Sequence, residues 1–154
     1  MPTGLLVPVG TVEAPPLEVF RAGERVTFCD SNSDFLGFLL GGGDRVNVDV
    51  AGATLCVYQL REDLANTHLV ITAELGERFT TALAHVYWMV EHQSDHGLLL
   101  PDCPNTFYSR DPDGIPWAVR CDWRSTYDGC HVEAHPIANL TLLRVGYRVI
   151  AQAA

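Results

Sequence analysis

The chain has 154 residues, of which 47% are hydrophobic and 19% charged, and this composition excludes a disordered or low-complexity chain. Its formal net charge is −9, and its 10 basic side chains are all arginines scattered along the sequence. Because no basic stripe exists, the charge disfavours nucleic acid and an anionic membrane as partners. The length is typical of one domain, so we predict a single domain over residues 1–154.

The cysteines and the absence of lysine bear on the cellular setting. Five cysteines are present, none in a Cys-x-x-Cys spacing, and we find no basic leader followed by an apolar segment. We therefore expect reduced thiols and a cytoplasmic protein. The absence of lysine favours a GC-rich coding bias over selection against lysine-directed tagging, because arginine keeps the positive charge.

The first half of the chain predicts short strands and one short helix. Pro8 favours an edge position for the first strand. Residues 35–40 form the predicted short helix, because residues 31–34 favour a helix start and the glycines at 41–43 favour its end. The predicted strands cover residues 4–9, 17–20, 25–29, 46–50 and 54–60.

Residues 72–96 predict one long amphipathic helix, with Gly97 as its C-terminal cap. Glu74 and Glu77 fall in its first turn, where the helix dipole favours acidic side chains. Residues 69–71 predict a short strand that leads into this helix. At about 100° per residue, one narrow stripe collects five apolar residues: Leu75, Phe79, Ala82, Val86 and Val90.

The final third of the chain predicts antiparallel strands. Residues 111–114, Asp-Pro-Asp-Gly, are typical of a hairpin turn, since proline fixes one corner and glycine tolerates positive φ. Apolar and polar residues then alternate over 115–124 and again over 130–135. A last strand is predicted over residues 140–150, with a bulge near residues 142–143.

The second hairpin sets the expected pairing of charged residues. A two-residue turn at residues 128–129 places Arg124 opposite Glu133 and Asp122 opposite His135. The predicted fold class is therefore α+β. It consists of an antiparallel sheet of six or more strands, one long amphipathic helix across a face, and a short helix in the N-terminal half.

Two groups of residues are candidates for a metal site. His131, Glu133 and His135 alternate along one face of a predicted strand and could bind zinc, with Asp122 as a fourth ligand or as a hydrogen-bond partner of a ligand. Cross-strand charge pairing is the simpler interpretation, because polar outer faces are ordinary in antiparallel sheets.

The second group is His85, His92 and His96, which lie within about 40° of one another on the predicted helix. Gln93 stands where the metalloprotease motif His-Glu-x-x-His has glutamate. The two turns from His85 to His92 span about 10 Å, too far for one tetrahedral ion. We therefore predict no cofactor, with zinc or another divalent metal as the alternative.

Short apolar motifs near the N-terminus resemble small uncharacterised proteins of actinobacteria and their phages. The resemblance covers about residues 1–60 and rests on residues 5–9, 17–20, 35–42 and 52–55. It implies the order strand, helix with glycines, strand, and an origin in a phage or other mobile element. Those proteins have no assigned activity, so the resemblance implies no functional residue.

The chain contains no Gly-x-Ser-x-Gly, Walker or dinucleotide-binding motif that would favour an enzyme. We predict a non-enzymatic, acidic protein-binding factor, phage-encoded or immunity-like, that contacts a host or cognate protein. Tyr87, Trp88 and Tyr127 are its candidate contact residues, because periodicity places them off the core stripes. The alternatives are a metal-binding protein or metal-dependent enzyme that uses the histidines, and a structural subunit of a phage or other assembly. A homo-oligomer is compatible with each.

Overall fold

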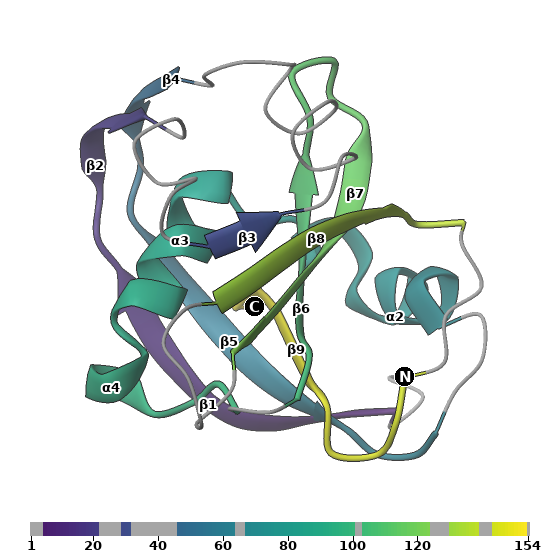
Figure 1. The fold of residues 1–154 in the computed structure, drawn as a ribbon. Helices are drawn as coiled ribbons and strands as arrows, with labels where there is room; N and C mark the ends of the chain where they lie inside the picture. The colour runs from purple at the N-terminus through teal and green to yellow at the C-terminus, as the bar shows by residue number, and fades with distance from the viewer. Residues whose placement is uncertain are drawn as a thin grey trace.

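The computed structural model describes residues 5–21, 29–31, 46–63, 67–100, 103–123, 130–138 and 143–153. In this part of the chain, seven strands form one sheet in the order β1-β5-β9-β6-β7-β8-β3, and β2 and β4 form a second sheet (Figure 1). The strands are β1 (Leu6–Ala14), β2 (Leu17–Arg21), β3 (Cys29–Ser31), β4 (Val46–Val50), β5 (Ala53–Leu60), β6 (Asn105–Arg110), β7 (Pro116–Trp123), β8 (Cys130–Pro136) and β9 (Arg148–Gln152).

The helices of the described residues are short. They are α2 (Thr67–Leu75), the 3-10 helix η3 (Gly76–Arg78), α3 (Leu83–Glu91) and α4 (Gln93–His96). None of these described helices has the length and apolar character that a membrane span requires.

The predicted fold class, α+β with an antiparallel sheet, is wrong. The described chain is mostly β, and the large sheet is mixed, because β6 runs parallel to β9 and β3 runs parallel to β8. Both parallel pairs join strands that are distant in the sequence. Local turn signals specify hairpins only, so they could not predict these pairings.

The predicted long amphipathic helix over residues 72–96 is also wrong. α2 ends at Leu75, immediately before Gly76, whose φ of 63° lies in the left-handed region. After η3 the chain becomes extended at Ala82, with φ −66° and ψ 139°. The extended segment is held by the sheet, because the Thr81 N–H donates to the Tyr108 carbonyl at 2.7 Å.

Two apolar clusters on opposite faces of the sheet explain why the helix breaks. Side chains alternate along a strand, so Leu55 of β5 belongs to one cluster and the adjacent Cys56 belongs to the other. α3 packs into the first cluster through Val86, whereas α2 packs into the second through Leu75. The apolar stripe predicted from the sequence therefore joins residues that are buried on different faces.

Several local predictions are confirmed. β1 lies at the edge of the sheet, and its register with β5 shifts between Pro8 and Gly10. The first hairpin turn closes where the Gly114 N–H donates to the Asp111 carbonyl at 2.9 Å. Helix α4 ends just before Gly97, whose φ is 63°.

The pairing of β7 with β8 differs from the prediction. Arg120 lies opposite Glu133 and Asp122 lies opposite His131. The two strands end at Trp123 and begin at Cys130, so their connection is longer than a two-residue turn. The predicted partner Arg124 lies outside the described residues.

Of the remaining predicted elements, two differ in the structure and two lie outside the described residues. Residues 69–71 are part of α2 rather than a strand. The last strand begins at Arg148 instead of residue 140, because a turn at Gly146, with φ 92°, precedes it. The predicted helix over 35–40 lies outside the described residues, as do residues 25–28.

Candidate functional site

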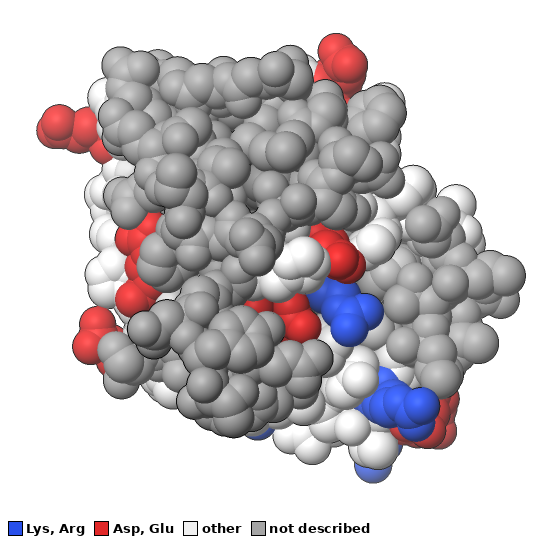
Figure 2. Space-filling model, viewed as in Figure 1, with Lys and Arg blue, Asp and Glu red and all other residues white. Residues whose placement is uncertain are grey.

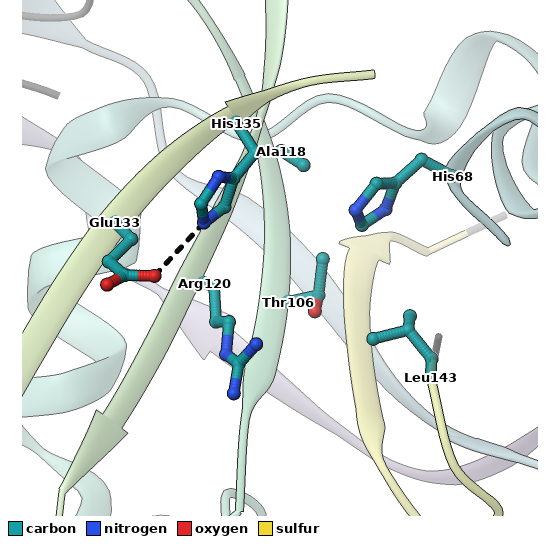
Figure 3. Close-up of a pocket in the computed structure, with 7 residues that line it drawn as sticks. All are labelled: His68, Thr106, Ala118, Arg120, Glu133, His135 and Leu143. Carbon is teal, nitrogen blue, oxygen red and sulfur yellow. Dashed lines mark hydrogen bonds and ion pairs between the residues drawn. The ribbon is translucent and has the colours of Figure 1, made fainter. Parts of the chain in front are cut away.

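A small pocket with polar and apolar lining residues lies on the sheet face that α2 covers in part. Its volume is about 140 Å³. Strands β6, β7 and β8 contribute most of its lining, α2 contributes one histidine, and a residue before β9 contributes a leucine (Figure 3). The lining residues are His68, Thr106, Ala118, Arg120, Glu133, His135 and Leu143.

The register of the strands brings the polar residues together. Thr106 of β6 pairs with Arg120 of β7, which in turn pairs with Glu133 of β8. In the next row Ala118 of β7 pairs with His135 of β8. Residues two apart on a strand share a face, so both rows point into the pocket.

Alternation along β8 separates a core face from the pocket face. Val132 and Ala134 are buried in the apolar cluster under α3. His131, Glu133 and His135 point to the other face and are partly exposed. This division is the one that the sequence pattern predicts for β8.

Glu133 is held by the two histidines on either side of it. The Nε2–H of His131 donates to one carboxylate oxygen at 2.6 Å, and the Nε2–H of His135 donates to the other at 3.0 Å. Partial burial raises the pKa of Glu133, but its hydrogen bonds and charge interactions with the two histidines together lower it by more, so its pKa lies below the ordinary value. The carboxylate is therefore ionised at neutral pH.

Arg120 contributes the positive charge of the pocket. Although its register partner is Glu133, no ion pair or hydrogen bond of its guanidinium is found within the described part of the chain. Figure 3 shows Arg120 directed toward the side of the pocket where Thr106 and Leu143 lie. Its donors are available to a ligand.

His68 enters the pocket from α2 and is tied to a buried tyrosine. Its Nδ1 lies 2.9 Å from the hydroxyl of Tyr108, and the two rings meet edge to face. Burial lowers the pKa of His68 to about 4, with a smaller contribution from His135. Burial also raises the pKa of Tyr108 well above its ordinary value. Both groups are therefore neutral at pH 7.

The charges near the pocket do not form a basic patch. On the face viewed in Figure 2, acidic side chains lie at several separate places, and the arginines that are most fully in view lie beside acidic residues. The described surface on this face therefore offers isolated positive groups, whereas a polyanion requires a continuous basic surface.

The helix histidines proposed from the sequence bond to the backbone instead of converging. His85 Nε2 lies 3.2 Å from the carbonyl of Pro15, and His92 Nδ1 donates to the carbonyl of Trp88 at 2.9 Å. His96 Nε2 donates to the carbonyl of Met89 at 2.8 Å. Within the described ranges, no group of three or more His, Cys, Asp or Glu side chains is placed to hold a metal ion.

The three proposed aromatic contact residues have different positions. Tyr87 is only 3% exposed, and burial raises the pKa of its phenol, so its side chain is part of the core. Trp88 is partly exposed and stacks on His92 with ring centroids 4.8 Å apart. Tyr127 lies outside the described residues.

The residues that β8 contributes to the pocket were predictable from the sequence, whereas those from β7 and α2 were not. The alternation in β8 identified Glu133 and His135. The role of Arg120 follows only from the true register, which the assumed two-residue turn obscured. No sequence pattern indicated His68 as a site residue. Residues 69–71 resemble a strand although they belong to α2, and the site depends on the packing of α2 over a distant part of the sheet.

Comparison with protein-family models, with curated proteins and with solved structures gives no match for this chain. The resemblance of residues 1–60 to actinobacterial and phage proteins therefore stays a prediction.

Proposed function

We propose that this protein is a non-enzymatic binding protein whose pocket between α2 and strands β6–β8 holds the anionic group of a ligand. The observation that carries the proposal is the guanidinium of Arg120, which lies at the pocket without a protein partner in the described chain. Arginine binds carboxylate and phosphate through paired hydrogen bonds, which makes it the natural anchor for such a group.

The size of the pocket supports binding of a group rather than of a whole cofactor. Its 140 Å³ would hold about four or five water molecules at their volume in the liquid. Pockets that enclose a complete drug-sized ligand measure about 300–1,000 Å³. The remainder of the ligand would therefore lie outside the pocket.

An NMR titration tests the proposal. Propionate, inorganic phosphate and sulfate are each added to the ¹⁵N-labelled protein in Tris buffer at constant ionic strength. We expect saturable shifts of the backbone amides of His68, Thr106 and Arg120 with at least one anion. If none of the three anions moves these amides, the proposed function is wrong.

A matched pair of variants assigns the binding to Arg120. Arg120→Gln removes the pocket charge, whereas Arg110→Gln removes an equal charge four residues beyond Thr106 on β6, roughly 13 Å away. Hydrogen bonds to a charged group contribute about 1.5–3 kcal/mol, so Arg120→Gln should weaken binding at least tenfold. Equal affinities of the two variants would contradict the assignment.

Protein contact is a second proposal, and the position of Trp88 favours it. The indole is partly exposed and stacked on His92, so it presents a rigid aromatic surface of the kind found at interface anchors. We expect Trp88→Ala to abolish capture of a dominant partner in a pull-down while circular dichroism stays unchanged. Unfolding of this variant would show that Trp88 serves the core instead.

A further inference from the structure

The hydrogen bond between His68 and Tyr108 determines which nitrogen of His68 carries the proton. Tyr108 is fully buried, and its hydroxyl has no second partner in the described part of the chain. A buried hydroxyl that did not donate would leave its hydrogen unsatisfied, at a substantial cost in stability. The hydroxyl therefore donates to Nδ1 of His68, and Nε2 carries the proton.

This arrangement makes Nε2–H of His68 a hydrogen-bond donor toward the pocket. His68 and Arg120 both line the pocket, and Figure 3 shows them on either side of Thr106, His68 entering from α2 and Arg120 from β7. An anionic group that lies between the two side chains would meet one charged donor and one neutral donor. A neutral donor does not add positive charge to the site.

The balance of charges limits the charge that the ligand can carry. Arg120 is positive and Glu133 is negative, while His68 is neutral, so these three lining residues have no net charge. A group with one negative charge can neutralise Arg120. A second negative charge would face the ionised Glu133, and the second imidazole of the lining, His135, already donates to that carboxylate.

The apolar part of the lining favours a carbon substituent beside the anionic group. Ala118 and Leu143 line the pocket and are both buried. A short aliphatic chain attached to the anion would contact these methyl groups, whereas the oxygens of a tetrahedral inorganic anion would lose water there without replacement.

From these observations we infer that the pocket is specific for a monocarboxylate on a short aliphatic chain, bound by Arg120 and by Nε2–H of His68. The inference rests on the proposed function and names the chemical class of its ligand. Tyr108 acts as a positioning residue, since it fixes the tautomer of His68 without touching the ligand.

Titrations with propionate and with sulfate test the ligand class. We expect propionate to bind with a millimolar dissociation constant and at least tenfold more tightly than sulfate, which is dianionic. If sulfate or inorganic phosphate binds as tightly as propionate, the inferred class is wrong while the proposed function stands. If no anion binds, the proposed function itself fails.

The tautomer of His68 is measured directly by long-range ¹H–¹⁵N correlation of the imidazole rings at pH 7. We expect a protonated Nε2 in the wild-type protein, and a mixture of tautomers together with three- to tenfold weaker propionate binding in Tyr108→Phe. His96 is the internal control. Its Nδ1 accepts from the Leu98 N–H at 3.1 Å, so its tautomer should stay unchanged in the variant.

The wild-type spectrum alone keeps the inference falsifiable if Tyr108→Phe does not fold. A protonated Nδ1 on His68 in the wild-type protein would overturn the role of Nε2–H. A folded Tyr108→Phe variant with unchanged propionate affinity would overturn the role of Tyr108.

Discussion

Glu133 lies directly opposite Arg120 in the register of β7 and β8, yet its carboxylate bonds to His131 and His135 instead. The two histidines occupy both carboxylate oxygens. The ordinary cross-strand ion pair is therefore not formed, and the guanidinium remains available at the pocket.

Glu133→Gln should change the preference of the pocket among anions. The substitution removes the negative charge that disfavours a dianion, so we expect sulfate affinity to rise severalfold and propionate affinity to rise less. Isothermal titration calorimetry measures both constants. Glu13→Gln is the control, because Glu13 bonds to Thr54 on the exposed β1–β5 pair and lies apart from the pocket lining. If the two substitutions changed the anion affinities equally, the cause would be the net charge of the protein rather than Glu133 at the pocket.

His68 should make the protein less stable in mild acid. Its pKa is about 4 in the folded protein and about 6.5 in the unfolded chain, so the unfolded chain binds the proton first as the pH falls. Stability is therefore lost between pH 6.5 and 4, by on the order of 2 kcal/mol at pH 5. Urea unfolding at pH 7 and pH 5 measures this loss. His68→Gln should show a correspondingly smaller loss, and an identical pH dependence would refute the prediction.

Zinc should not bind at the group His131, Glu133 and His135 of β8. Both Nε2 atoms already donate to the carboxylate, so a metal ion would have to displace two hydrogen bonds. We expect no stoichiometric zinc uptake in calorimetry and no change of melting temperature with EDTA. A 1:1 zinc complex that His135→Gln abolishes would contradict this expectation and support the metal-binding alternative.

Gly76→Ala distinguishes a broken helix from a continuous one. At φ 63° an alanine is strained by about 1–2 kcal/mol, and the open space around Gly76 excludes a steric clash as the cause. In a continuous helix the same substitution would stabilise the protein by about 0.5–1 kcal/mol. The change in the free energy of unfolding that Gly76→Ala causes, measured in urea, therefore has opposite signs for the two structures. Gly114→Ala, at φ 84° in open space, should behave like Gly76→Ala.

The sequence predicted the local elements well and the long-range ones poorly. The correct predictions depend on residues close together in the sequence. They are the edge position of β1, the turn at Gly114 and the alternation along β8. The prediction of the long helix failed because helical periodicity places Leu75 and Val86 on one stripe, whereas they pack on opposite faces of the sheet. Periodicity gives no information about the sheet against which a helix packs.

The candidate site was predictable only where one strand supplied it. Glu133, His131 and His135 follow from alternation in β8. Arg120 joins them through the register of β7 with β8, and His68 joins them through the packing of α2. Neither relation is encoded in a short stretch of sequence.

The most direct test of the account is the dissociation constant of propionate for the wild-type protein, Arg120→Gln and Arg110→Gln, measured under identical conditions. We expect millimolar binding to the wild-type protein and to Arg110→Gln, and binding at least tenfold weaker to Arg120→Gln. Undetectable binding to the wild-type protein, or equal affinity in all three proteins, would contradict it.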